Sequence, residues 1–192
     1  MHMTSVRQIL RITLAPVAAL SLTGVASGVL APAAHAASVS HAVKVTKVTF
    51  KGTYTGTIAM LWDANTVSAT AVKGTGTGTL LGKSTVAGTG TASTSSTCDP
   101  LWGSVSITGS GSKLMLKVVS SSATKACAAA ETAPTTVTVT GVAKITGGVG
   151  KYKGASGTLK ISGSFQIQSN TAGSHETDTF KATLSGVVTI RK

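Results

Sequence analysis

Residues 135–168, TTVTVTGVAKITGGVGKYKGASGTLKISGSFQIQ, contain two runs in which apolar and polar residues alternate. In the first run valines and Ile145 share one face, and threonines occupy the other. In the second run Leu159 and Phe165 lie on the apolar face, opposite serines, lysine and glutamine. A period of two over this length is typical of strands with one buried face, so the stretch predicts an antiparallel hairpin joined by the glycine-rich loop 147–157.

The same alternation continues on both sides of this hairpin, and no helix of useful length competes with it. We expect eight strands, around residues 43–62, 68–80, 84–92, 105–109, 113–120, 135–146, 157–168 and 179–190. Residues 93–102 and 121–134 are expected to be loops, with a turn of helix as an option at residues 126–131.

Glycine recurs in the middle of these strands on the predicted inward face. The positions are Gly52, Gly56, Gly74, Gly76, Gly88, Gly141, Gly163 and Gly186. An inward glycine marks a sharp bend or a close backbone approach, which a small, strongly coiled barrel requires. We therefore predict an all-β fold, a single eight-stranded antiparallel closed β-barrel over residues 43–192, with a β-sandwich as the alternative. The inward glycines leave either a filled barrel or a real cavity, and the side chains that can fill the interior are Phe50, Tyr54, Ile58, Phe165 and Phe180.

The first 36 residues are typical of a secretory signal peptide. Arg7 and Arg11 precede the uncharged apolar stretch 12–30, and Ala34 and Ala36 supply small residues for cleavage before residue 37. A retained membrane anchor is the alternative. We expect a secreted, extracellular protein with a flexible lead at residues 37–42. No later stretch approaches the roughly 20 apolar residues of a spanning helix, so we predict no transmembrane segment in the mature chain.

The chain is strongly basic, with a formal net charge of +12. This balance favours acidic partners such as an anionic cell-envelope polymer, whereas the alternative is a merely solvated basic surface. Lysines are spread along the strands, aromatic residues make up 4% of the chain, and basic and aromatic residues are not interleaved. We therefore expect no nucleic-acid partner.

The two cysteines, Cys98 and Cys127, fall in the two long loops. An even pair in an exported chain is most simply a disulfide. A metal pair or a catalytic thiol is the alternative, but neither cysteine has a histidine nearby in the sequence.

Alternate loops of an up-and-down barrel lie at the same end. The loops after the first, third, fifth and seventh strands would then bring both tryptophans, both cysteines and all five acids to one mouth, and leave a basic, glycine-rich other end. The candidate ligand-binding residues are Trp62, Asp63, Asp99, Trp102, Glu131, His175, Glu176 and Asp178. One alternative is a hard-cation site formed by His175, Glu176 and Asp178 together with Asp63 or Asp99. Others are acid–base catalysis by Glu176 or Asp178 with His175, and simple solubilisation of the loops. We assign no metal, no cofactor and no catalytic residue.

The loop Gly147-Gly148-Val149-Gly150-Lys151-Tyr152 resembles a recurrent hairpin of the allene oxide cyclase and dirigent barrel superfamily. In that family an apolar strand leads into Gly-Gly-Thr-Gly followed by a basic and an aromatic residue, and Val149 here replaces the usual threonine. The resemblance implies an eight-stranded barrel with Tyr152 folded over one end. It also implies a choice of activities, since dirigent proteins guide phenoxy-radical coupling and allene oxide cyclases close a fatty-acid-derived epoxide.

Family pockets of the dirigent type carry carboxylates, arginine and tyrosine. In the predicted strand phases Tyr54 is the one inward tyrosine, Arg191 is the one arginine after the leader, and inward carboxylates are absent. We therefore expect a secreted binding or structural barrel, non-enzymatic, that binds a small apolar ligand or an anionic envelope polymer. An isomerase or stereochemical auxiliary that acts on an apolar small molecule is the alternative.

Overall fold

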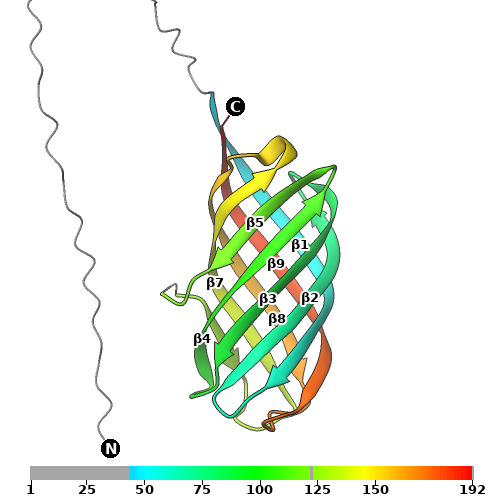
Figure 1. The fold of residues 1–192 in the computed structure, drawn as a ribbon, viewed down its shortest axis with the longest axis vertical. Helices are drawn as coiled ribbons and strands as arrows, with labels where there is room; N and C mark the ends of the chain where they lie inside the picture. Colours follow the sequence, from blue (N-terminus) through cyan, green and yellow to red (C-terminus); the bar gives the residue numbers. More distant parts are fainter. Residues whose placement is uncertain (1–43, 122, 192) are drawn as a thin grey trace, which may run out of the picture. The chain divides into compact units, whose positions relative to one another are not determined.

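The computed structural model describes residues 44–121 and 123–191, which form an all-β structure (Figure 1). In chain order the elements are β1 (Val45–Trp62), β2 (Thr66–Gly78), β3 (Gly82–Ser93), β4 (Cys98–Gly109), β5 (Ser112–Val118), β6 (Lys125–Ala128), β7 (Thr135–Val149), η1 (Gly150–Tyr152), β8 (Ser156–Ile167) and β9 (His175–Arg191). The short 3₁₀ turn η1 is the one helical element of the described residues. The predicted signal peptide (1–36) and lead (37–42) lie outside them.

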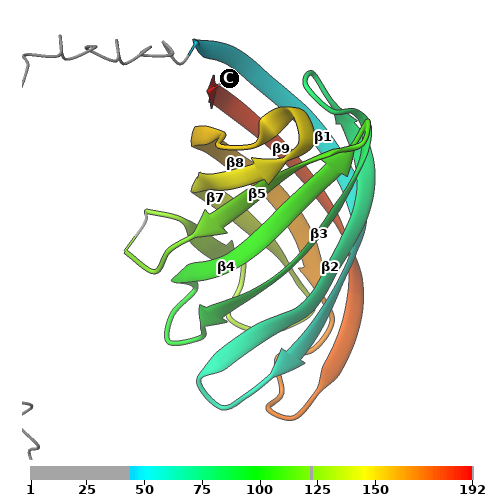
Figure 2. The ribbon, with the colours of Figure 1, turned by 45° about the horizontal axis from the view of Figure 1, so that its top comes forward.

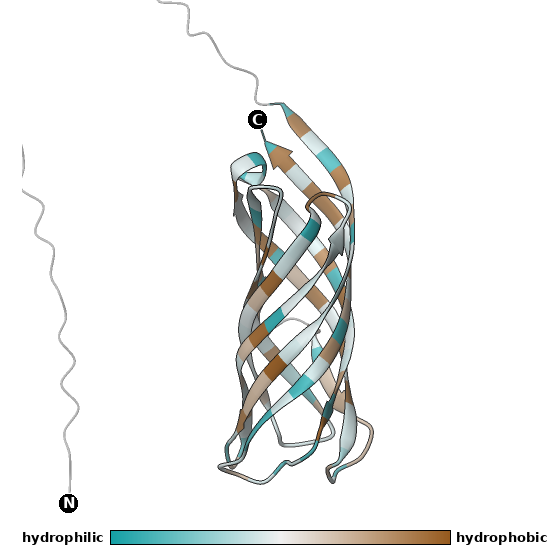
Figure 3. Ribbon diagram, turned by 90° about the vertical axis from the view of Figure 1, so that its right-hand side faces the viewer, coloured by the Kyte–Doolittle hydropathy of each residue, from teal (hydrophilic) through white to brown (hydrophobic). Residues whose placement is uncertain are grey.

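Eight strands pair in a closed antiparallel ring, in the order β1, β2, β3, β4, β5, β7, β8, β9 and back to β1. Figure 2 shows these strands curving around a common interior. Hydrophobic and hydrophilic residues alternate along them, as the period of two requires (Figure 3). The predicted eight-stranded closed barrel is confirmed, and the sandwich alternative is wrong.

β6 is a ninth strand, additional to the ring. Beyond the end of β5 it pairs with the same two neighbours, β4 and β7. Between β5 and β6, the buried Thr124 donates a hydroxyl hydrogen bond to the Val142 carbonyl (2.9 Å) and accepts one from the Val142 N–H (2.8 Å). A Cβ on the adjacent Gly141 would lie 2.3 Å from the Thr124 Cα. Because residue 141 has no side chain, the Thr124 side chain can approach β7 there. Its hydrogen bonds replace the backbone pairing of β7 that is interrupted between β5 and β6.

Three expected boundaries are wrong. β4 begins at Cys98 instead of near residue 105, because residues 98–100 find partners in β6. β6 itself is extended where a turn of helix was an option. β9 begins at His175, because β1 continues to pair with it as far as Leu61.

The connections alternate between the two ends of the barrel, as expected for an up-and-down meander. The loops 63–65, 94–97, 129–134 and 168–174 lie together at the lower end in Figure 1. Backbone hydrogen bonds join them: the Thr94 N–H donates to the Asn65 carbonyl (3.1 Å), and the Gly173 N–H donates to the Trp62 carbonyl (2.7 Å). At the upper end Tyr152 is buried, and its hydroxyl donates to the Leu80 carbonyl, so the predicted cover over one end is confirmed.

The half of the barrel next to the upper end, called here the filled half, is packed around Phe50, Tyr54, Leu81, Leu114 and Leu159. All five side chains are fully buried or nearly so. Inward glycines make room for the rings: a Cβ on Gly52 would lie 2.8 Å from the Tyr54 ring, and one on Gly76 would lie 2.6 Å from it. The Tyr54 hydroxyl is 3.1 Å from the Ser84 hydroxyl, which gives the buried phenol a hydrogen-bond partner.

Candidate functional site

The half of the barrel next to the lower end, called here the hollow half, contains a cavity of about 500 Å³. Side chains from seven of the eight ring strands line it, including Ile58, Val67, Val105, Val139, Phe165 and Ile167. The cavity reaches the lower-end loops, where Ser96, Glu131 and Asn170 lie on its border. Of the two interiors that the sequence left open, a filled barrel and a real cavity, the structure has one in each half: side chains fill the upper half, and the lower half is hollow.

The cavity has a simple origin in the side chains of the hollow half. Gly90 of β3 pairs directly with Gly103 of β4, so neither strand projects a side chain inward at this level. Ala69 on β2 and Ala126 on β6 add two more small inward residues to the wall. A concave space lined mainly by apolar atoms is the usual form of a small-molecule site, and the volume of this cavity falls within the roughly 300–1,000 Å³ typical of such sites.

Trp62 and Glu176, two of the predicted residues, meet at the lower end of this cavity. Trp62 ends β1 and is 7% exposed, and its indole Nε1–H donates to Glu176 Oε1 (2.7 Å). Glu176 Oε2 accepts from the backbone N–H groups of Gln168 (2.8 Å) and Ser169 (3.2 Å). This one carboxylate therefore ties the loop after β8 to the wall of the cavity through three charge-assisted hydrogen bonds.

Asp178 lies one inward step further along β9, opposite Ile58 of β1. Its Oδ2 is buried and has no hydrogen-bond partner among the described residues. Burial raises the pKa of Asp178, and both the negative charge of Glu176 and hydrogen bonding to it raise this pKa further. Asp178 therefore retains its proton to higher pH than an ordinary aspartate does.

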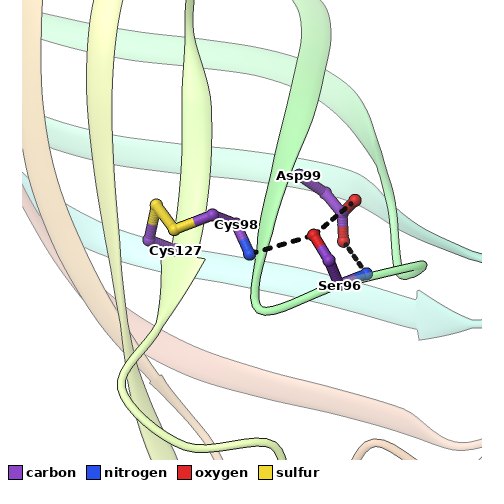
Figure 4. The surroundings of a disulfide bond; sticks show 4 residues. All are labelled: Ser96, Cys98, Asp99 and Cys127. Atoms are coloured by element: carbon purple, nitrogen blue, oxygen red, sulfur yellow. Dashed lines mark hydrogen bonds between the residues drawn. A yellow bond between two sulfur atoms is a disulfide. The ribbon is translucent and has the colours of Figure 1, made fainter.

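Asp99, another predicted residue, also faces inward and shapes the mouth of the cavity. It is 5% exposed, and its Oδ2 accepts from the Ser96 N–H (2.8 Å) while Oδ1 accepts from the hydroxyls of Ser95 (2.8 Å) and Ser96 (3.2 Å). Figure 4 shows these bonds from Ser96 beside the disulfide. Asp99 therefore holds the loop 94–97 folded against the barrel.

The predicted disulfide between Cys98 and Cys127 is confirmed. The two residues are directly paired across β4 and β6, with their Cα atoms 4.0 Å apart (Figure 4). The bond fastens the added strand β6, which forms part of the cavity wall, to the ring.

The remaining predicted residues do not converge on one point. Glu131 borders the cavity, and its carbonyl accepts from the Asn170 amide (3.0 Å). Asp63 and His175 are exposed, on the β1–β2 turn and at the start of β9. Trp102 lies on the outward phase of β4 and is 36% exposed, and it also borders the cavity beside Gly103. Within residues 44–121 and 123–191, no group of three or more histidine, cysteine, aspartate or glutamate side chains could hold a metal ion.

The expectation that inward carboxylates are absent is wrong, since Asp99, Glu176 and Asp178 all take the inward phase. Extending the alternation of β9 backwards from Phe180 places Asp178 and Glu176 on the same face, so the sequence contained this signal. Asn170, Ser95 and Ser96 were missed, because no periodicity marks loop residues that meet only in the folded chain.

Comparison with protein-family models, curated proteins and solved structures finds no match for this chain. In the described part of the chain, no helix is long and apolar enough to cross a membrane.

Proposed function

We propose that this protein is a secreted, non-enzymatic binding protein that holds a small apolar molecule in the hollow half of its barrel. The observation that carries the proposal is the cavity of about 500 Å³ and its largely aliphatic lining. Filling such a space removes apolar surface of both ligand and protein from water, at roughly 25 cal/mol per Å².

The polar groups at the cavity mouth indicate how the ligand would be oriented. Glu131, Asn170 and the serines of loop 94–97 lie at the lower end, whereas the inner wall is formed by valines, isoleucines and Phe165. An amphiphile with an apolar body and one polar end fits this distribution: the body enters the barrel, and the polar end remains among hydrogen-bonding groups. Secretion rests on the predicted signal peptide and agrees with the use of a disulfide.

The proposal is tested by titrating the mature chain, residues 37–192, with a panel of fatty acids and phenolic compounds. Trp62 lines the cavity, so we expect its fluorescence to change on binding. Val139→Phe places a ring in the cavity and should abolish the change. Val187→Phe is the matched control, because Val187 is 47% exposed on β9 and should leave binding intact. Equal binding by the wild type and Val139→Phe would show that the ligand lies elsewhere.

The same titration separates binding from the isomerase or auxiliary alternative. The alternative requires a group that reaches a bound molecule. Asp99 and Glu131 line the cavity, whereas Asp178, the carboxyl whose pKa is raised, does not. Recovery of the ligand chemically unchanged after prolonged incubation is expected for a binding protein. Conversion of the ligand, or a change in its enantiomer ratio on chiral chromatography, would favour the alternative.

A further inference from the structure

A second hollow lies on the outer surface of the barrel, across the wall formed by β2, β3, β4 and β5. This open groove has a volume of about 770 Å³. Gly90 and Gly103 line both this groove and the internal cavity, as do Ala69, Thr89, Thr91, Trp102 and Val118, so the two spaces lie on opposite sides of one thin stretch of sheet. Most of the side chains that border the groove face outward, and the proposed ligand mouth at the lower end does not account for it.

Strand register places the outward side chains of the groove in two rows that cross the strands. In the first row Ser68 pairs with Thr91, and Thr91 pairs with Trp102. In the second row Thr89 pairs with Ser104, and Ser104 pairs with Lys117. Neighbouring strands lie about 4.8 Å apart, so each row of three spans about 10 Å.

The rows present hydroxyl groups that the protein itself does not use. No side-chain hydrogen bond is made within the described residues by Ser68, Thr89, Thr91 or Ser104. Each hydroxyl can donate one hydrogen bond and accept others, which matches a ligand that is itself rich in hydroxyl groups.

Trp102 supplies an apolar surface at the end of the first row. Its side chain is 36% exposed, and beside it Val119, which follows β5, is 40% exposed. An exposed indole next to a row of hydroxyls suits a ligand that combines apolar ring faces with polar edges, because the aromatic ring packs on the face while the hydroxyls bond the edge. Sugar rings have this character, whereas a purely apolar ligand would leave the hydroxyls unpaired.

The charge of the groove favours acidic sugars over neutral ones. Lys117 is its one charged lining residue, none of the five acids of the chain borders it, and the chain as a whole is basic. A negatively charged ligand therefore meets a cation and no opposing carboxylate.

From these observations we propose that the groove centred on Trp102 binds a glycan chain, preferably one with acidic sugars. Trp102 stacks on a sugar ring, the serine and threonine rows bond the ring hydroxyls, and Lys117 pairs with a sugar carboxylate. Ser68, Ser104 and Lys117 line the groove but not the cavity, so variants at these positions test the groove separately from the cavity.

The test is retention of the mature chain in native gels that contain soluble polygalacturonate, with long-chain polyphosphate as a polyanion without sugar rings. Trp102→Ala should weaken polygalacturonate binding about tenfold, the order expected for losing one stacking contact together with its buried area. Any polyphosphate binding should be unchanged in this variant, because it would depend on charge alone. Val187→Ala on β9 is the control for an exposed apolar residue outside the groove.

Two further variants keep the test decisive if Trp102→Ala does not fold. Ser104→Val removes a hydroxyl from the second row and should weaken binding to polygalacturonate and to neutral dextran alike. Lys117→Gln should weaken binding to polygalacturonate but not to neutral dextran. Unchanged polygalacturonate binding in these variants, or equal losses for polygalacturonate and polyphosphate in Trp102→Ala or Ser104→Val, would overturn the proposal. Titration of Ser104→Val with the fatty-acid and phenolic panel, followed by Trp62 fluorescence, shows separately whether the internal cavity is intact.

Discussion

In the filled half of the barrel aromatic rings lie against inward glycines, whereas in the hollow half two inward glycines face each other across the β3–β4 pair. Around Tyr54 the missing Cβ of Gly76 leaves space that a ring occupies. Between β3 and β4 the missing side chains of Gly90 and Gly103 leave space that nothing from the protein fills. Inward glycine therefore permits both a tightly packed core and a cavity, and the residues on the neighbouring strands decide which forms.

The two halves also differ in what holds them together. The filled half depends on the burial of side chains such as Phe50 and Leu159, which are fully inaccessible to solvent. The hollow half has fewer such contacts and instead carries the Cys98–Cys127 bond, the Trp62–Glu176 hydrogen bond and the bonds of Asp99 to its loop. Covalent and polar links thus stabilise the part of the barrel where packing is incomplete, which leaves the cavity available for a ligand.

The sharpest test of this difference is the same substitution at a glycine of each half. A Cβ on Gly76 would lie 2.0 Å from the Thr53 carbonyl oxygen and 2.6 Å from the Tyr54 ring. We expect Gly76→Ala to lower the free energy of unfolding by about 3 kcal/mol or more, because backbone and a packed ring must both move. A Cβ on Gly90 would meet only the Trp102 carbonyl oxygen, at 3.2 Å, as its nearest neighbour. Gly90→Ala should therefore change stability by about 1 kcal/mol or less.

Urea denaturation of both variants, followed by tryptophan fluorescence and circular dichroism, measures the two free energies. Similar losses of unfolding free energy in Gly76→Ala and Gly90→Ala would contradict the proposed difference, since they would show that the two halves are equally constrained. A large loss confined to Gly76→Ala would support it.

Removal of the disulfide is expected to have the next largest effect. The bond closes a loop with a sequence separation of 29, and a loop of that length corresponds to about 3–4 kcal/mol in the chain-entropy model, an amount that native-state effects commonly reduce. The Cys98→Ser, Cys127→Ser double variant should also bind the cavity ligand less tightly, because Ala126 and Ala128 of β6 form part of the wall. The reduced wild-type protein is the matched comparison and should lose the same free energy. An unchanged denaturation midpoint in the double variant would show that the hollow half does not depend on this link.

The sequence predicted the ring of strands, but it did not predict the division of the barrel into a filled and a hollow half. Alternation along the strands predicts which side chains face inward, and the chain order of the loops predicts that Trp62 and Glu176 share an end. The cavity depends on which inward residues stand opposite each other, and the pairing of Gly90 with Gly103 follows only from strand register. The strand β6 was missed for a related reason, since four residues carry too little periodicity and their pairing partners lie in β4 and β7.

Asp178 provides the smallest expected effect and the one most specific to the hollow half. Burial and the neighbouring Glu176 raise its pKa in the folded protein above the value of about 3.9 that an unfolded aspartate has. Between the two pKa values the folded chain holds a proton that the unfolded chain has released, so stability falls as the pH rises through this window and remains lower above it. Ile58, the residue opposite Asp178 on β1, is apolar. Glu176 is therefore the titratable group that raises the pKa of Asp178.

Asp178→Asn removes this titration while it preserves the size of the side chain. We expect the variant to be more stable than the wild type at neutral pH, and the difference to vanish below about pH 3.9, where the wild-type carboxyl is protonated in both states. Asp63→Asn is the charge-matched control, because it removes one exposed carboxylate from the β1–β2 turn. Urea midpoints measured from pH 3 to pH 8 give the comparison. A stability difference between Asp178→Asn and the wild type that stayed constant with pH would contradict this prediction. It would mean that the packing of the amide, and not the proton on Asp178, distinguishes the two proteins. The stability of the hollow half would then not depend on the titration of this carboxyl pair.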